Sequence, residues 1–378
     1  MMQRRRNFRG VASEGNGDRV IVASIQGEYP EERRLGNDLS ENMDKINDVI
    51  SPEAVTAAGG LCAPLEPYYG IQVISEASRP VRDALANFGA DRGGVRYLPP
   101  PHLSDVSDAI GITTEAEDSV GYNSDGSSGH AIYKPCLHVT CGSEQTVTID
   151  AIHRCLTFGN FAARTYPEQV QAWIQLALAS HARTAETKLL DAISAECTQV
   201  TAANTYSASR SLLPQLDAAV AGYRSRHRAS DGLRLHIMLP SWAKGALRAD
   251  LARGYTYERS ALSVTDEEIT SWFTARNVTV SWYVDSETGK NQVFGAQSTG
   301  ALNAFPSTVR WYLYVEGSFV FLDGGTLDLG LVRDSELISV NDYQIFAETF
   351  EAVAFFGIEA LAITSTVTYD GKYAPAAS

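Results

Sequence analysis

Apolar residues recur at steps of three and four throughout residues 165–197, the longest uninterrupted helical pattern in the chain. Thr165 and Glu168 have the spacing of a capping box, and Pro167 falls in the first turn, where its missing N–H needs no partner. The apolar stripe consists of Val170, Trp173, Ile174, Ala177, His181, Ala185, Leu189, Ala192 and Ile193. The pattern predicts one helix of roughly 30 residues, about 45 Å long.

A helix of this length needs other segments packed along it. We expect Trp173 and Ile174 to be buried within the chain's own fold. No second helical pattern of comparable length is present, which disfavours a long helical bundle.

Residues 1–60 are polar and contain one short strand-like run, from Val20 to Ile25. Such a composition cannot bury enough apolar area for its own core, so we predict an N-terminal arm, either disordered or laid along another surface. The arm carries a cluster of arginines: Arg4, Arg5, Arg6 and Arg9. This cluster fits a solvated tip as well as a contact with a polyanion.

The pattern changes at residues 61–94, where Pro, aromatic and β-branched residues predict the start of a compact domain. Residues 95–140 then predict a long β-hairpin, with one strand from Val95 to Leu98 and another resuming at Ile132. The intervening tip is rich in Asp, Glu, Ser and Gly, and we expect it to rest on another molecule. The residues predicted to make this contact are Glu117, Asp118, Tyr122 and Asp125.

The remaining segments predict a mixed architecture. Residues 141–204 contain a strand that leads into the long helix, followed by a polar linker over 198–211. Residues 205–335 show the order strand, helix, helix, strand, typical of an α+β module, and end in two strand-like runs joined at Gly324–Gly325. Residues 336–378 predict strands that return to the first domain, with Glu351 at a position that needs no burial. The fold class is therefore α+β.

Composition excludes several functional classes. The chain has 378 residues, 44% of them hydrophobic, which is ample for two or three folded domains. Its formal net charge of −14 argues against a dedicated nucleic-acid binder. No apolar run approaches the ~18 to 20 residues that cross a bilayer, so we expect no membrane partner. Five cysteines are too few for a disulfide scaffold.

One cluster has ligand types that suit zinc: Cys136, His138, Cys141, His153 and Cys155. Its spacing does not match a zinc knuckle, because alternate residues of extended strands point to opposite faces. Cysteines that serve as small apolar strand residues, and a disulfide formed after assembly, are the two other interpretations. We predict no metal site.

Catalytic signatures are missing from the sequence. It contains no Walker loop, G-x-G-x-x-G, G-x-S-x-G or H-E-x-x-H motif. Ser180 and His181 are neighbours within the predicted helix and do not face each other. We therefore predict neither an enzyme nor a cofactor, although a catalytic site assembled from scattered residues stays open as an alternative.

The order of the parts resembles the major capsid protein of tailed double-stranded-DNA phages, the Hong Kong 97-type fold. The strings that carry the resemblance are SPEAVTAAGGLCAPLEPYYG at 51–70, RPVRDAL with ADRGGVRYLPPP within 79–101, CLTFGNFAARTYPEQVQAW at 155–173, and LVRDSELISVNDYQIFAETFEAVAFFGIEAL at 331–361. They look most like capsid proteins of phages that infect actinobacteria, and the resemblance covers nearly the whole chain.

The resemblance implies a structural subunit of an icosahedral virion shell, assembled in the host bacterial cytoplasm. Residues 1–60 would be the N-terminal arm, 95–140 the extended loop over a neighbouring subunit, and 165–197 the spine helix of a peripheral domain. Residues 205–335 would be the axial domain, and 336–378 the C-terminal strands of the peripheral domain with a tail. The implied partners are copies of the chain in hexamers and pentamers, packaged double-stranded DNA contacted non-specifically, a portal, and in some systems a decoration protein.

Two departures from the family pattern matter. Some relatives carry a scaffolding region before the arm, and none precedes it here. Either the scaffold is a separate protein or the chain is a processed product, and the initial Met-Met favours a separate scaffolding protein. Some relatives also cross-link subunits through a lysine on the extended loop, but Lys134, at the base of the hairpin, is the only lysine there. We therefore expect no such cross-link. An encapsulin-type nanocompartment, which has the same fold around a protein cargo, is the alternative to a phage capsid.

Overall fold

The computed structural model describes residues 8–9, 24–25, 34–50, 71–118, 136–202, 207–254, 264–290 and 306–368. The chain divides into two compact units, residues 1–70 and 71–378. In the first unit, β1 (Phe8–Arg9) pairs antiparallel with β2 (Ser24–Ile25), and α1 spans Leu39–Ile50. The sequence pattern did not predict α1. At the start of this helix, Asp38 Oδ1 accepts a hydrogen bond from the Ser40 N–H at 2.9 Å.

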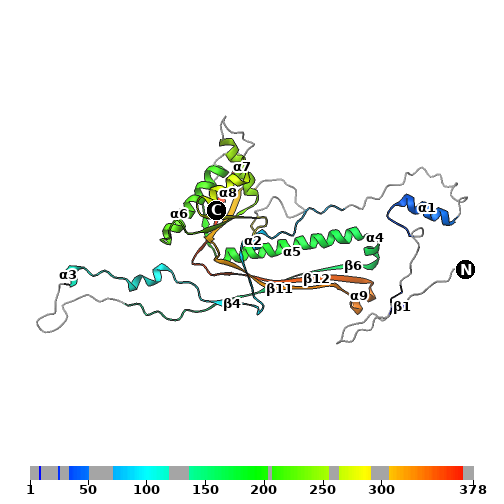
Figure 1. Cartoon of the computed structure of the whole chain (residues 1–378), viewed down its shortest axis with the longest axis horizontal. Helices are drawn as coiled ribbons and strands as arrows, with labels where there is room; N and C mark the ends of the chain where they lie inside the picture. The colour runs from blue at the N-terminus through cyan, green and yellow to red at the C-terminus, as the bar shows by residue number, and fades with distance from the viewer. Residues whose placement is uncertain are drawn as a thin grey trace. The chain divides into compact units, whose positions relative to one another are not determined.

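The second unit contains a four-stranded sheet in the order β3-β11-β12-β6. Its strands are β3 (Ala86–Gly89), β6 (Asp150–Gly159), β11 (Phe319–Val332) and β12 (Asp342–Phe355). β12 is antiparallel to both β11 and β6, and β3 is parallel to β11. The long helix α5 (Pro167–Ala195) lies along one face of this sheet (Figure 1). It is fixed there by the hydrogen bond that Arg154 Nη1 donates to the Ala177 carbonyl at 2.7 Å.

Helix α5, with 29 residues, confirms the predicted long helix but differs from the prediction in its start and in its buried face. Thr165 belongs to a separate short helix, α4 (Asn160–Thr165), where its hydroxyl donates to the Phe161 carbonyl, so the predicted capping box is wrong. Trp173 is 51% exposed, which contradicts its predicted burial, and Ile174 is half-buried. The buried residues are Ala172, Ala179, Ala182, Ala185, Glu186, Leu189, Leu190 and Ile193, most of them in the second half of the helix.

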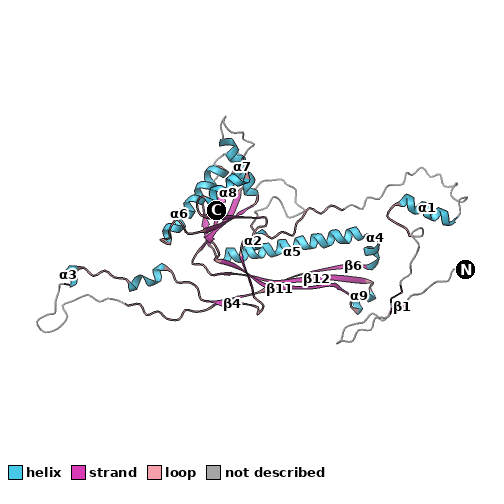
Figure 2. Ribbon diagram, viewed as in Figure 1, coloured by secondary structure: helices cyan, strands magenta, loops and turns pink. Residues whose placement is uncertain are grey.

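A five-stranded sheet in the order β7-β13-β10-β8-β9 forms the other half of the second unit. Its strands are β7 (Thr198–Thr201), β8 (Leu235–Pro240), β9 (Val278–Tyr283), β10 (Thr308–Val315) and β13 (Ala360–Thr366). The helices packed with it are α6 (Leu213–Arg226), α7 (Trp242–Gly254) and α8 (Asp266–Thr274), shown in Figure 2, and a single π-helical turn (Ala208–Leu212) precedes α6. Its core includes Leu216, Ile237, Phe273 and Trp311, all fully buried. Both sheets are mixed and contain antiparallel pairs, which confirms the α+β class.

Three sequence predictions fail in this half. β7 and the π-helical turn occupy the supposed linker 198–211. The turn between β10 and β11 lies at Gly317, where φ is +83°, a backbone conformation that favours glycine. Gly324–Gly325 instead lies inside β11 at a register shift. The last strand, β13, pairs with β10 and β7, so only β12 returns to the sheet under α5.

The predicted hairpin has a shorter ladder than expected. β4 (Gly94–Tyr97) pairs antiparallel with β5 (Gln145–Thr148), whereas residues 136–144 contain no strand. The returning strand therefore pairs later than the predicted start at Ile132, which lies outside the described residues. The outgoing chain forms a 3-10 helix (Leu103–Ala109) and the short helix α3 (Glu115–Asp118). The remaining short helices are α2 (Pro80–Asp83) and α9 (Ser335–Ser339).

The two sheets share a core at the end of α5. Leu189, Leu190 and Ile193 of the helix pack with Tyr312 of β10 and Phe321 of β11. Among the helices that the structure describes, none is both long and apolar enough to span a bilayer. The second half of α5 is the structural joint between the two sheets, and its first half lies along the face of the four-stranded sheet.

Candidate functional site

A buried three-residue charge network lies at the joint. Arg79, just before α2, donates through Nη1 and Nη2 to the two carboxylate oxygens of Glu351 on β12, each at 2.6 Å. Its Nε lies 3.3 Å from Oε1 of Glu186 on α5. The side chains of Glu186 and Glu351 are 0% and 5% exposed. The network therefore ties α2, α5 and β12 together, and the expectation that Glu351 needs no burial is wrong.

Glu186 also holds the first turn of α2. Its Oε2 accepts the Val81 N–H at 2.7 Å and its Oε1 accepts the Arg82 N–H at 3.2 Å. Burial raises the pKa of Glu186, whereas these N–H groups and the Arg79 guanidinium act in the opposite direction. The Glu186 carboxylate thus caps the N-terminus of α2, because the side chain of the N-cap residue, Arg79, makes no capping hydrogen bond.

A second pair lies one turn earlier on α5. Arg183 donates through Nη2 to the Ser78 carbonyl, and its Nη1 lies 3.3 Å from Oδ2 of Asp285, in the segment after β9. Asp285 is 3% exposed, and burial raises its pKa to about 6, with the Arg183 charge opposing the shift. Arg183 thus connects α5 both to the segment that precedes α2 and to the segment that follows β9.

A third arginine, Arg310 on β10, is buried and joins the end of α5 to the five-stranded sheet. Its Nε lies 2.8 Å from Oε1 of Glu287, its Nη1 donates to the Thr364 hydroxyl at 2.9 Å, and its Nη2 donates to the Ser194 hydroxyl at 3.0 Å and to Gln199 Oε1. Glu287 is 7% exposed. These contacts fix the second half of α5 between the two sheets.

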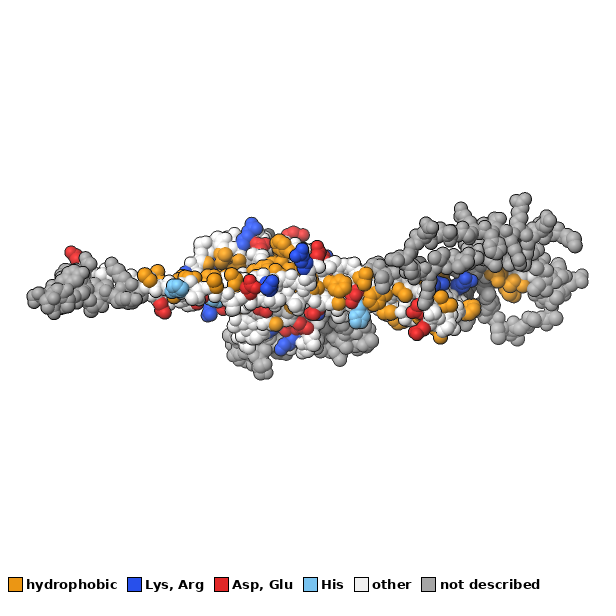
Figure 3. Space-filling view, turned by 90° about the horizontal axis from the view of Figure 1, so that it is seen from below, with side chains coloured by type: hydrophobic (Ala, Val, Ile, Leu, Met, Phe, Trp, Pro, Cys, Tyr) orange, Lys and Arg blue, Asp and Glu red, His pale blue; other side chains and the backbone are white. Residues whose placement is uncertain are grey.

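The hairpin, in contrast, leaves large apolar side chains uncovered. Those that are exposed on its described parts are Leu98, Leu103, Val106, Ile110, Ile112, Leu137 and Val139. Ile112 alone is 91% exposed. Figure 3 shows hydrophobic side chains at separate places along the hairpin, and several exposed large apolar side chains on one element are typical of an interaction surface.

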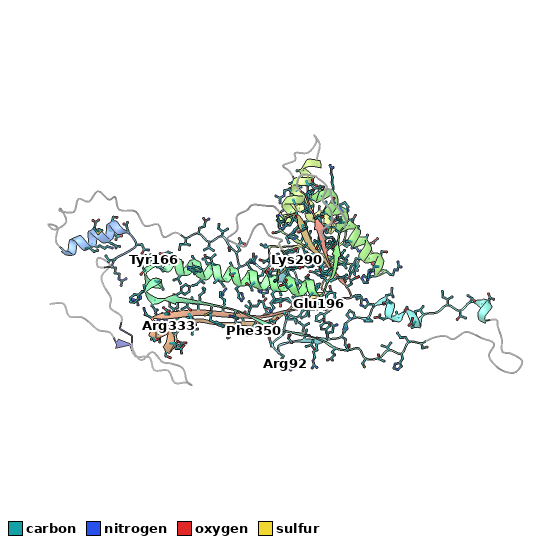
Figure 4. All side chains as sticks on the ribbon, turned by 180° about the vertical axis from the view of Figure 1, so that it is seen from behind. Arg92, Tyr166, Glu196, Lys290, Arg333 and Phe350 are labelled. Carbon is teal, nitrogen blue, oxygen red and sulfur yellow. The ribbon has the colours of Figure 1, made fainter. Side chains whose placement is uncertain are left out.

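The first half of α5 is uncovered as well. Tyr166 and Glu196 mark the two ends of the helix in Figure 4, and buried core contacts concentrate toward Glu196. Exposed apolar side chains near the other end are Phe161, Tyr166, Trp173, Leu176 and Leu178. Of the stripe predicted from sequence, Ala185, Leu189 and Ile193 are buried, Trp173 is exposed and the other residues are half-buried.

The predicted contact residues fall mostly beyond what the structure describes. Arg4, Arg5, Arg6, Tyr122 and Asp125 lie outside the described residues. The backbones of Arg9 in β1 and of Glu117 and Asp118 in α3 are placed, but the orientations of their side chains are not described. Their roles stay predictions.

The cysteine and histidine cluster does not converge on a metal. Cys136 and Cys141 lie in the irregular return of the hairpin, and Cys155 lies on β6, all with exposed free thiols. His153 stacks on Phe346, with ring centroids 6.5 Å apart. Within the described ranges, no three His, Cys, Asp or Glu side chains are grouped as metal ligands. The structure therefore gives no support to the zinc alternative.

Comparison with known proteins adds information at the level of the fold. The sequence matches no protein-family model and no curated protein. Among solved structures, the chain is similar to "Mycobacterium phage Ogopogo", with 11% identity, a TM-score of 0.50, and coverage of 80% of this chain and 97% of that chain. The chain has the Hong Kong 97-type capsid fold.

Two other solved structures are similar at lower TM-scores. "Asymmetric unit of bacteriophage PhiM1 mature capsid" has 13% identity, a TM-score of 0.49, and coverage of 80% of this chain and 92% of that chain. "Crystal structure of virus-like particle from Pyrococcus furiosus" has 9% identity, a TM-score of 0.42, and coverage of 76% and 92%. Identities this low concern the Hong Kong 97-type fold only.

Within the Hong Kong 97-type fold, α5 is the expected spine helix. Sequence reasoning found this helix but missed the charge network that fixes it. One signal was present: Glu186 stands between Ala185 and Leu189, next to the predicted apolar stripe. A carboxylate so placed needs a buried partner, but the partner, Arg79, is 107 residues away in the chain and carries no local pattern.

Proposed function

We propose that this chain is the major capsid subunit of a tailed double-stranded-DNA phage and assembles with copies of itself into an icosahedral shell. The observation that carries the proposal is a Hong Kong 97-type fold whose projecting hairpin exposes apolar side chains that no other described segment covers. The subunit acts as a building element of the virion and not as an enzyme.

The hairpin explains why assembly is favourable. A two-stranded ribbon is at best marginally stable alone, and the described ladder has only four pairs of residues. Fully burying one Leu or Ile side chain contributes about 1.5 to 3 kcal/mol. Covering several of the exposed hairpin residues against a neighbouring subunit therefore stabilises both the arm and the contact, in hexamers and pentamers alike.

The net charge of the chain is consistent with a shell that encloses DNA. The net charge of −14 keeps a shell from binding packaged DNA tightly, because affinity for a polyanion increases with each phosphate neutralised. DNA is then contacted non-specifically and locally, and Arg4, Arg5, Arg6 and Arg9 are the candidates for that contact or for binding an acidic scaffolding protein. Deleting residues 1–10 should change packaging or assembly yield, and an unchanged phage titre would reject this role.

Other partners follow from the same proposal. A separate scaffolding protein, a portal and in some shells a decoration protein would join the subunit, and assembly would take place in the host cytoplasm before the virion is released. The tip residues Glu117, Asp118, Tyr122 and Asp125 would contact a neighbouring subunit. No metal or cofactor is required for any of these roles.

Electron microscopy and sedimentation of the purified protein test the proposal. Icosahedral shells of hundreds of subunits that protect DNA from nuclease are expected. Small shells with protein cargo would instead support the encapsulin alternative, which the long acidic hairpin and arm disfavour. A monomer or small oligomer at all concentrations would contradict both the phage capsid and the encapsulin alternative, and would favour an enzyme with an unrecognised site.

A matched pair of variants tests the hairpin itself. Ile112→Asp introduces a charge at the most exposed large apolar side chain among the described residues of the hairpin and should abolish or greatly reduce shell formation. Ser107→Asp introduces the same charge at an exposed polar position of the same arm and should assemble normally. Equal assembly of the two variants would contradict an apolar hairpin contact.

A further inference from the structure

The charged side chains at the joint form one cluster with more negative than positive charge. Its two guanidinium groups belong to Arg79 and Arg183, and its three carboxylates belong to Glu186, Glu351 and Asp285. The carboxylate side chains are 0%, 5% and 3% exposed, so water hydrates them little. Besides burial, the charges of Arg183, Glu186 and Arg79 all act on the pKa of Asp285, which joins the two groups electrostatically. With every side chain ionised, the cluster holds one negative charge that its own cations do not compensate.

Asp285 is the least well compensated of the three carboxylates. Glu351 accepts two hydrogen bonds of 2.6 Å from Arg79, and Glu186 accepts two backbone N–H groups of α2 besides its contact with Arg79. Asp285 Oδ2 has its ion pair with Arg183 Nη1 at 3.3 Å, but it accepts no hydrogen bond of good geometry from a described residue. A buried charge that is poorly compensated is neutralised by a proton at less cost than it is kept. The geometry therefore directs the proton to Asp285.

The other titratable groups on the elements around Asp285 have contacts of their own. These are Lys188 with Asp150 at 2.6 Å, Asp191 with the Thr288 hydroxyl at 2.6 Å, His181 with the Ile152 carbonyl at 3.0 Å, Glu287 with Arg310 at 2.8 Å, Tyr283 with the Arg310 carbonyl, and Arg82 with Asp323 at 3.6 Å. Asp83 of α2 is exposed to solvent. Among the contacts that the structure describes, these groups give Asp285 no second cation, so the excess charge stays with the cluster.

We propose that the joint between the two sheets takes up one proton at Asp285 in mildly acidic solution and is held more tightly in that state. The neutral carboxyl removes the excess charge, and its carbonyl oxygen still accepts a hydrogen bond from Arg183. Arg183 also donates to the Ser78 carbonyl, so this contact connects the segment after β9, α5 and the segment before α2. Asp285 lines an open groove of about 760 Å³ together with Ser180 and Thr184, through which water exchanges protons with it.

The direction of the pH effect follows from the two protonation equilibria. Burial raises the pKa of Asp285 from its ordinary 3.8 to about 6 in the folded chain. The folded chain therefore binds this proton more tightly than the unfolded chain, and the contribution of Asp285 to stability increases as the pH falls from about 7 toward 4. Between pH 7.5 and 5.0 this contribution lowers the ratio of unfolded to folded chain about tenfold, equivalent to about 1.4 kcal/mol.

Urea unfolding of the full-length unassembled subunit and of Asp285→Asn tests the inference at these two pH values. Asparagine retains the shape of the side chain without its charge. The native chain should be less stable than Asp285→Asn at pH 7.5, and the ratio of their unfolding constants should decrease about tenfold by pH 5.0. Glu351→Gln is the matched control, because it removes the same charge from the cluster but weakens the hydrogen bonds from Arg79, and it should be less stable than the native chain at pH 7.5.

A native chain that is more stable than Asp285→Asn at pH 7.5 would show an ordinary stabilising ion pair with Arg183 and would overturn the inference. A ratio of unfolding constants that is equal at the two pH values would do the same. If the variant does not fold, the carboxyl ¹³C chemical shift of Asp285 in the native chain decides: a titration midpoint near pH 6 supports the inference, and one near pH 4 overturns it. All these measurements use the unassembled subunit, so their outcome is independent of whether the chain forms shells.

Discussion

Replacing Arg79 by Met tests whether the buried charge network stabilises the joint. The substitution retains an unbranched apolar stem but removes both 2.6 Å hydrogen bonds to Glu351 and the 3.3 Å contact with Glu186. Two carboxylates that are 5% and 0% exposed then lose their cation. Because removing one partner of a buried ion pair leaves an uncompensated charge, the free energy of unfolding should fall by about 3 to 5 kcal/mol at pH 7.

The chain provides a matched control at Arg82. Its guanidinium also lies over the Phe321 ring, at 5.2 Å compared with 5.8 Å for Arg79, but its partner Asp323 is 3.6 Å away. The side chains of Arg82 and Asp323 are 38% and 36% exposed, so solvent screens this pair. Arg82→Met should therefore cost about 0 to 1 kcal/mol.

Urea unfolding of the unassembled subunit measures both variants, with the fluorescence of the chain's tryptophans, including the fully buried Trp311, as the signal. The deficit of Arg79→Met should decrease between pH 7 and pH 5, because protonation neutralises a carboxylate that has lost its cation. Equal losses for the two variants, or a deficit for Arg79→Met that does not change with pH, would refute the reasoning.

Three further predictions concern other parts of the chain. Burial lowers the pKa of His236 from 6.5 to about 4. Acidification from pH 6.5 to 4 therefore protonates this histidine first in the unfolded chain and should remove about 3 kcal/mol of stability. In urea unfolding, the difference in free energy of unfolding between the native protein and His236→Gln should shrink across that range. Gly324→Ala would place a Cβ 2.8 Å from Phe350 Cβ and should cost about 1 to 3 kcal/mol in thermal unfolding, whereas Gly222→Ala in α6, which meets nothing within 4 Å, should be neutral or stabilise the fold. Shells boiled in detergent should give one band near 41.0 kDa, because the only lysine of the hairpin, Lys134, lies at its base and we expect no cross-link through it. A ladder of larger bands would contradict this.

Local pattern was sufficient for several elements because their signals are contained in adjacent residues. The period of three and four residues predicted α5, and the Thr265 hydroxyl accepts the Glu268 N–H at 3.3 Å, as the residue types at the start of α8 indicate. Asn277, with φ of +54°, ends the turn after α8, a position where asparagine is tolerated. These features depend on backbone preference and near neighbours.

The sequence by itself therefore determined that the chain is an α+β protein with one very long helix, and that its order of parts resembles the Hong Kong 97-type fold. Only the tertiary structure decided which face of α5 is covered, because covering depends on β6 and β12, whose positions no local pattern encodes. It also decided that β13 joins the five-stranded sheet and that Glu351 is buried. The partner of Glu351, Arg79, is 272 residues away, and at that separation only the folded chain brings the two charges together.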